Sequence, residues 1–156
     1  MDKKLLNKSI NNLLNNCAEL DKNDSLLIIS EDPKFGWYDK EISVAVHNYA
    51  KNQLGLNTEL LIVGEPKNNS KNTIEKVIDN YDCAIFFARI GDQERFETPS
   101  SNTKRIMSYA RNIDSLCSLF SSTNYLEMRK FKDLINKIIF EANNIEISCP
   151  LVTKLK

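Results

Sequence analysis

The 156-residue chain is 42% apolar and 27% charged, which are the proportions of an ordinary globular protein and exclude a disordered tail. Its 21 lysine and arginine residues equal its 21 aspartate and glutamate residues in number. The chain therefore lacks the excess positive charge that attracts nucleic acid or anionic lipid. The length predicts a single domain over residues 1–156.

Sequence signals for a membrane, for export and for metal binding are all weak. The longest purely apolar run, 84–88, is far shorter than the roughly 20 residues that a membrane-spanning helix needs. Polar residues interrupt the N-terminal segment, which argues against a signal peptide. The cysteines are widely spaced and His47 is the single histidine. We therefore expect a cytoplasmic protein with no membrane partner, no nucleic-acid partner, no bound metal and no cofactor.

Hydrophobic periodicity predicts alternating helices and strands. Apolar residues at three- and four-residue steps predict helices over 5–20, 42–54, 74–81, 106–113 and 128–142. Short apolar runs predict strands over 26–29, 60–63, 84–88 and 116–120, and strict alternation predicts an edge strand over 145–149. This pattern is typical of a three-layer α/β/α domain of Rossmann or flavodoxin type, with about five mainly parallel strands and an extra N-terminal helix.

Two long loops follow the strands predicted over 26–29 and 84–88. In an open α/β sheet, ligands bind beyond the carboxyl ends of the strands, at the point where the strand order reverses. Both long loops flank that point if the strand order is 2-1-3-4-5, so we predict that order. We expect any functional site in these loops.

Charged and hydroxyl side chains of these loops would line a crevice, and the predicted set is Glu31, Asp32, Arg89, Asp92, Arg95 and Ser101. Three interpretations remain open, because acids and arginines could form a salt-bridged rim, could contact a ligand, or could take part in metal binding or catalysis. No glycine-rich phosphate loop and no nucleophile-elbow motif occurs in the sequence, and no catalytic residue is assigned.

Two further features of the loops each allow two interpretations. The polar run 100–105 predicts the start of a helix, where backbone N–H groups either bind an anion or are capped by Ser101 and its neighbours. Phe35, Trp37 and Tyr38 cluster in the first loop. Such aromatic residues form either a hydrophobic plug over the sheet edge or a contact patch for another domain, subunit or ligand.

Three stretches of the sequence carry a family resemblance. They are Leu13–Leu20 followed by a polar turn and Ser25–Ile29, then Asp82–Phe87, and finally Ile145–Pro150. Together they resemble the N-terminal domain of thermophilic-type metallo-aminopeptidases and their leucyl-aminopeptidase-like relatives. The resemblance implies that the metal ligands belong to a following C-terminal domain, so no ligand is carried over to this chain.

These observations lead to three functional hypotheses. The first is a non-catalytic Rossmann-like binding or assembly domain, similar to the N-terminal half of a metallo-aminopeptidase. The second is a domain that binds a small molecule or nucleotide in the crevice. The third is a hydrolase that acts only with a missing domain or partner. The expected partners are a second copy of the chain, a missing C-terminal domain or a small anionic ligand.

Overall fold

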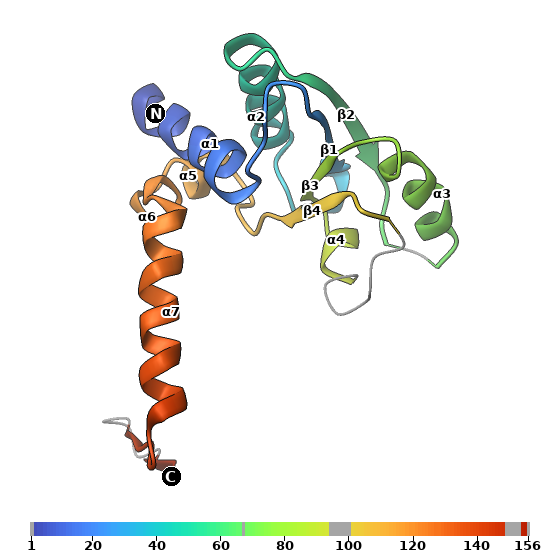
Figure 1. The fold of residues 1–156 in the computed structure, drawn as a ribbon. Coiled ribbons are helices and arrows are strands. Elements are labelled where there is room, and N and C mark those ends of the chain that lie inside the picture. Colours follow the sequence, from blue (N-terminus) through green and yellow to red (C-terminus); the bar gives the residue numbers. More distant parts are fainter. Residues whose placement is uncertain (1, 67, 94–100, 149–153, 156) are drawn as a thin grey trace. The chain divides into compact units, whose positions relative to one another are not determined.

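The computed structural model describes residues 2–66, 68–93, 101–148 and 154–155, and the chain divides into two compact units over residues 1–123 and 124–156 (Figure 1). The first unit contains, in chain order, α1 (Lys3–Asn11), the π-helix η1 (Asn12–Cys17), β1 (Ser25–Glu31), the 3₁₀ turn η2 (Pro33–Phe35), α2 (Lys40–Gln53), β2 (Asn57–Val63), α3 (Asn68–Ile78), β3 (Cys83–Phe87), α4 (Ile90–Gln93), β4 (Lys104–Met107), α5 (Ile113–Leu116) and α6 (Leu119–Ser122). The second unit contains α7 (Tyr125–Glu141), β5 (Ile147–Ser148) and β6 (Lys154–Leu155). A single domain over 1–156 stays a prediction.

A four-stranded parallel sheet with the order β2-β1-β3-β4 forms the centre of the first unit. Ile28 of β1 lies opposite Leu60 of β2 on one side and Ile85 of β3 on the other. This arrangement confirms the α/β class and the predicted order of the first three strands. The sheet has four strands among the described residues rather than the predicted five.

Helices pack on both faces of this sheet because the central strand is buried on both sides. Leu26 and Ile28 belong to a core cluster that includes residues of α1, η1 and α2. Leu27 and Ile29 point the other way, into a cluster that includes Ile78 of α3. All four strand residues are fully buried, as an unbroken apolar run predicts.

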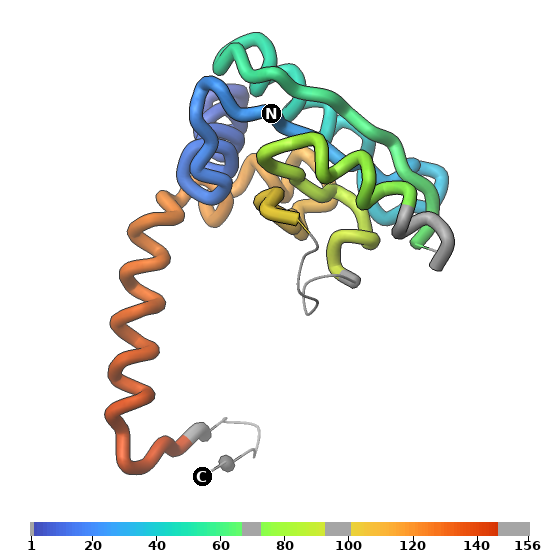
Figure 2. Tube along the Cα trace, turned by 45° about the vertical axis from the view of Figure 1, so that its right-hand side comes forward, coloured from blue at the N-terminus to red at the C-terminus, as the bar shows by residue number. Residues whose placement is uncertain are grey.

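The N-terminal helical segment is tied to the last helices of the first unit. The side-chain amide of Asn12 donates hydrogen bonds to the carbonyl oxygens of Ser121 and Thr123, at 3.0 and 2.7 Å. Figures 1 and 2 both show α1 beside α5 and α6, although more than a hundred residues separate Asn12 from Ser121. The helix predicted over 5–20 begins as α1 and continues as a π-helix, in which Asn16 donates to the Asn12 side chain.

The two elements predicted between 106 and 120 are wrong. Residues 104–107 form β4 where a helix over 106–113 was expected, and 116–120 fall on α5 and α6 where a strand was expected. The side chains of Asn112 and Ser118 accept hydrogen bonds from N–H groups three residues later, which stabilises two short helices. Leu119 and Phe120 are about four-fifths exposed, so this apolar run is not a buried strand.

The edge strand predicted over 145–149 is not part of the parallel sheet. Its residues Ile147–Ser148 pair in antiparallel fashion with Lys154–Leu155, inside the second unit. Cys149 lies outside the described residues. Alternating hydrophobicity specifies one covered face and not the pairing partner, so it suits a two-stranded ribbon as well as a sheet edge.

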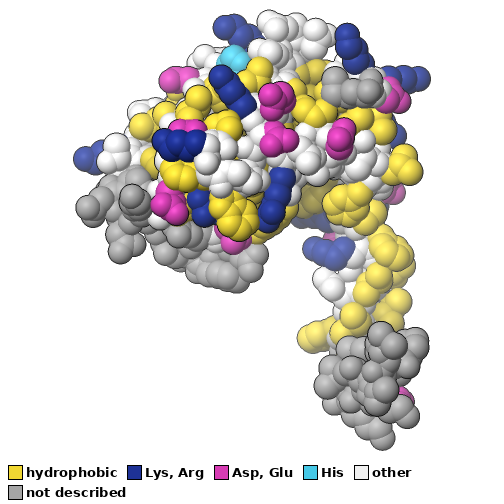
Figure 3. All heavy atoms as spheres, turned by 180° about the vertical axis from the view of Figure 1, so that it is seen from behind, with side chains coloured by type: hydrophobic (Ala, Val, Ile, Leu, Met, Phe, Trp, Pro, Cys, Tyr) yellow, Lys and Arg dark blue, Asp and Glu magenta, His cyan; other side chains and the backbone are white. Residues whose placement is uncertain are grey.

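No described helix combines the length and the apolar character needed to cross a lipid bilayer. On the face of the molecule that Figure 3 presents, acidic and basic side chains are interspersed. This distribution agrees with the equal numbers of acidic and basic residues in the sequence.

Candidate ligand-binding pocket

A pocket of about 440 Å³ lies at the carboxyl edge of the parallel sheet. Every strand contributes to its lining: Trp37 and Tyr38 follow β1, Glu65 and Pro66 follow β2, Arg89 and Asp92 follow β3, and Met107, Tyr109 and Arg111 end or follow β4. This edge is where parallel α/β sheets bind their ligands, because the strand order reverses around β1.

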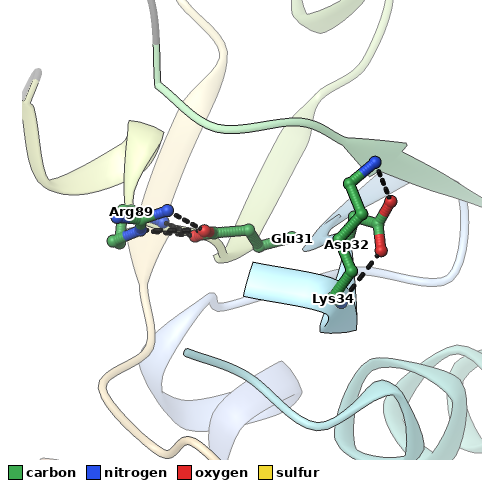
Figure 4. Close-up of polar contacts among 4 residues, drawn as sticks. All are labelled: Glu31, Asp32, Lys34 and Arg89. Carbon is green, nitrogen blue, oxygen red and sulfur yellow. Dashed lines mark hydrogen bonds and ion pairs between the residues drawn. The ribbon is translucent and has the colours of Figure 1, made fainter. Parts of the chain in front are cut away.

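Glu31 does not line the pocket itself, but it fixes the position of Arg89, which does. Glu31 is the last residue of β1 and is only 1% exposed. Its carboxylate accepts a hydrogen bond from the backbone N–H of Arg89 at 2.9 Å and another from Nε at 2.8 Å. Figure 4 shows the two side chains pointing toward each other across the sheet edge. The hydrogen bonds to Glu31 raise the pKa of the Arg89 guanidinium, because they stabilise its charged form.

The pairing of β1 with β3 explains why these two residues meet. Ser30 lies opposite Phe87 in the sheet, so Glu31, the next residue of β1, and Arg89, two residues beyond Phe87, come together at the carboxyl edge of the sheet. Carboxylate and guanidinium form charge-assisted hydrogen bonds when they share such a position. Glu31 and Arg89 thus form an ion pair that fixes the start of the loop after β3.

Two guanidinium groups contact the ring of Trp37. The Cζ atoms of Arg89 and Arg111 lie 4.8 and 4.9 Å from the centroid of that ring. Cations at this distance are attracted to the electron-rich face of an indole. Trp37 remains 40% exposed, so the arginines and the indole together present a cationic and aromatic surface to the pocket.

Arg111 differs from Arg89 in its electrostatic environment. The backbone N–H of Asp39 donates a 2.8 Å hydrogen bond to the Arg111 carbonyl oxygen, which holds this loop against the start of α2. Within the described part of the chain, the Arg111 guanidinium has no hydrogen-bonding or ion-pair partner. The side chain is exposed, and its charge is free to meet a ligand.

Two tyrosines complete the aromatic wall. The hydroxyl of Tyr38 donates to the Ser108 carbonyl oxygen at 3.3 Å, and burial raises the pKa of this phenol. The hydroxyl of Tyr109 donates to a carboxylate oxygen of Asp92 at 2.6 Å. Each hydroxyl therefore has a partner within the protein, and the rings are left to contact an apolar ligand surface.

The structure brings together only some of the residues predicted to line the crevice. Arg89 and Asp92 line the pocket, and Glu31 lies behind Arg89. Asp32 instead pairs with Lys34 at 2.9 Å and caps the 3₁₀ turn η2 (Figure 4). The hydrogen bond from the Lys34 side chain lowers the pKa of Asp32. Arg95 lies outside the described residues.

The helix start predicted at 100–105 is not present in the described part of this run, residues 101–105, so neither reading of a helix start, capping or anion binding, applies there. The described part of this run enters β4 directly, because the Thr103 hydroxyl donates to the carbonyl oxygen of Tyr81 at 2.9 Å and Lys104 begins the strand. Ser101 does not line the pocket, and its buried hydroxyl has no partner among the described residues. The polar residues before Lys104 therefore lead into an edge strand of the sheet and not into a helix.

The aromatic cluster of the first loop divides in the structure. Trp37 and Tyr38 line the pocket, as a ligand-contact patch would. Phe35 does not line it, and its ring is contacted instead by the ammonium of Lys34 at 5.1 Å. Two of the three aromatic residues thus line the pocket, and the alternatives of hydrophobic plug and contact patch both stay predictions.

Sequence reasoning missed three lining residues with polar groups, namely Glu65, Tyr109 and Arg111. Glu65 comes directly after the strand that was predicted over 60–63, so its place at the carboxyl edge could have been inferred. Tyr109 and Arg111 were assigned to a helix, which hid their position after β4. A correct strand assignment for 104–107 would have placed both at the same edge.

The cysteines take different environments. Cys83 is buried, whereas Cys17 and Cys117 are half-buried. The described residues hold no group of three or more histidine, cysteine, aspartate or glutamate side chains placed to bind a metal ion.

Comparison with family models, with curated proteins and with solved structures finds no match to this chain.

Proposed function

We propose that this domain binds a small organic anion in the pocket at the carboxyl edge of its sheet. The observation that carries the proposal is the guanidinium of Arg111, which faces the pocket beside Trp37 with no acidic partner among the described residues. A carboxylate is the natural partner of such a group, because two parallel N–H donors match its two oxygens.

The remaining lining supports a ligand with an apolar body. Trp37, Tyr38 and Tyr109 offer aromatic surfaces, and Met107 and Pro66 add apolar contacts. A volume of about 440 Å³ lies within the range of small-molecule sites, which combine apolar walls with a few placed polar groups. An aromatic or branched carboxylate suits this combination of size, charge and surface.

The single tryptophan of the chain lies in the pocket, so its fluorescence tests the proposal directly. We expect phenylacetate to change Trp37 fluorescence in a saturable way and to raise the melting temperature, since a ligand that binds only the native state stabilises it. Phenethylamine has the same ring with a positive charge and should produce neither effect. Equal or tighter binding of the amine would contradict the proposal.

Arg111→Gln should weaken the binding of phenylacetate at least about tenfold, because a charge-assisted bidentate pair is lost. Lys22→Gln provides the matched control. It removes the same charge from an exposed residue in the turn before β1, at the opposite edge of the sheet. An equal loss of affinity in both variants would mean that overall charge, and not this pocket, attracts the probe.

The resemblance to aminopeptidase N-terminal domains, the assembly of copies and activity with a missing partner stay predictions. The binding proposal does not depend on them, because it rests on residues of the first unit alone.

A further inference from the structure

The two arginines of the pocket are not equivalent as anion receptors. Glu31 is almost completely buried and directs its carboxylate at the backbone N–H and the guanidinium of Arg89. The carboxylate of Glu31 therefore balances the positive charge of Arg89 before any ligand binds. Arg111 has no such counter-charge among the described residues.

The other charged residues of the lining disfavour a second negative charge on the ligand. Glu65 and Asp92 both line the pocket, so among the described lining residues two guanidinium groups face two carboxylates even before Glu31 is counted. One ligand charge can be matched by Arg111. A second negative charge on the same ligand would meet carboxylates and an arginine that is already neutralised.

From this balance we infer that the pocket selects monoanions, such as carboxylates, over dianionic phosphate esters, and that Glu31 is the positioning residue that sets this selectivity. The inference rests on the proposed function, since it names the class of anion that the same pocket accepts. Glu31 does not line the pocket itself and acts through Arg89.

Three probes that share a phenyl ring distinguish the effect of the ligand's charge from the effect of its phosphate group. Phenylacetate and methyl phenyl phosphate carry one negative charge each. Phenyl phosphate carries close to two at about pH 8, because the second pKa of a phosphate monoester is about 6. Dissociation constants would be measured by Trp37 fluorescence and by calorimetry.

We expect phenylacetate and methyl phenyl phosphate to bind with similar affinity, and phenyl phosphate to bind at least about fivefold more weakly than both. If phenyl phosphate binds as tightly as the monoanions or more tightly, the inference is wrong while the anion-binding proposal survives. If none of the probes binds, the proposed function itself fails.

Substitution of Glu31 tests its role in selectivity. Glu31→Gln removes the counter-charge of Arg89, so we expect the affinity for phenyl phosphate to rise at least about fivefold relative to phenylacetate. The double variant Glu31→Gln with Arg89→Gln removes both charges and should restore the original preference. Glu59→Gln makes the same change in net charge at an exposed residue of β2 and should leave the preference unchanged.

A preference that does not change in Glu31→Gln would refute the role of Glu31. If this single variant does not fold, the ranking of the three probes on the unaltered protein tests the selectivity, and the role of Glu31 is tested by comparing Arg89→Gln with the double variant. Arg89→Gln keeps the Glu31 carboxylate and should discriminate more strongly against phenyl phosphate than the double variant does, and equal discrimination would refute that role. A purely structural role for Glu31 would lower stability without changing the ratio of the two affinities.

Discussion

The carboxylate of Glu31 accepts hydrogen bonds from both the backbone N–H and the guanidinium of Arg89, so that one acidic side chain fixes the main chain and the side chain of its partner. The Glu31 side chain is 1% exposed and that of Arg89 is 28% exposed. The neighbouring ion pair of Asp32 and Lys34 is far more open, with side-chain exposures of 32% and 67%. Two ion pairs that begin at adjacent residues therefore differ mainly in burial.

Arg89→Ala should destabilise the first unit by about 3 kcal/mol, because it leaves the buried carboxylate of Glu31 without its charged partner. Lys34→Ala removes the exposed partner of Asp32 and should lower stability much less than Arg89→Ala does, because solvent screens an exposed ion pair. Urea unfolding followed by circular dichroism would compare the two variants. Equal effects would show that burial does not distinguish the two pairs.

Gly91→Ala should destabilise the protein by about 1–3 kcal/mol through overpacking. A Cβ atom at this position in α4 would lie 2.6 Å from Cγ of Phe86 in β3, which is closer than real Cβ contacts. Phe86 is itself buried and has little room to move. Gly64→Ala is the control, because a Cβ there meets nothing within 4 Å, and its melting temperature should stay close to that of the unaltered protein.

Asn12→Ala should cost about 1–3 kcal/mol, because the carbonyl oxygens of Ser121 and Thr123 both lose a donor in a partly buried position. Asn15→Ala is a matched change within the same π-helix. The amide of Asn15 is exposed and donates to the Asn11 side chain, so its loss should cost no more than about 0.5 kcal/mol. Thermal unfolding would measure both, and similar losses would contradict a role for Asn12 in holding α6.

Cys83 should make stability fall at alkaline pH. Burial raises the pKa of its thiol from an ordinary value of 9.0 to about 12, so above pH 9 the unfolded chain ionises while the native thiol stays protonated. This group therefore contributes fully below pH 9, and its contribution decreases by up to about 1.4 kcal/mol per pH unit between pH 9 and 12.

Comparison with Cys83→Ala isolates that contribution from the titration of lysines and tyrosines. Urea unfolding of both proteins at several values from about pH 8 to 11 should give a shallower loss of stability in the variant. Parallel pH profiles for the two proteins would contradict the prediction. Iodoacetamide should also leave Cys83 unmodified in the native protein at about pH 8, because the thiolate is the reactive form.

The central part of the fold could be predicted because its residues are buried on both faces. Leu26 to Ile29 form an unbroken apolar run, which is typical of a central parallel strand, and the structure confirms a strand there. Gly55 directly follows the helix predicted over 42–54, and its φ of +68° is the left-handed conformation in which glycine often ends a helix. Local patterns determine such elements almost completely.

The fourth strand could not be predicted, because β4 is a short edge strand whose residues are only partly buried. Its sequence, Lys104–Met107, has no long apolar run, whereas the more apolar 116–120 lies in two capped helical turns. The wrong helix over 106–113 also affected the prediction of the candidate site, since it placed Tyr109 and Arg111 on a helix and not at the carboxyl edge of the sheet. The pairing of Glu31 with Arg89 depends on strand register, which single-sequence patterns do not specify.

The order of the strands has a consequence for synthesis on the ribosome. β1 emerges first, β2 then joins one of its edges, β3 joins the other, and β4 extends the sheet beyond β3. Each strand after β1 thus finds a completed neighbour when it leaves the exit tunnel and need not wait for a later segment. The sheet can be assembled vectorially, from its middle outward, as translation proceeds.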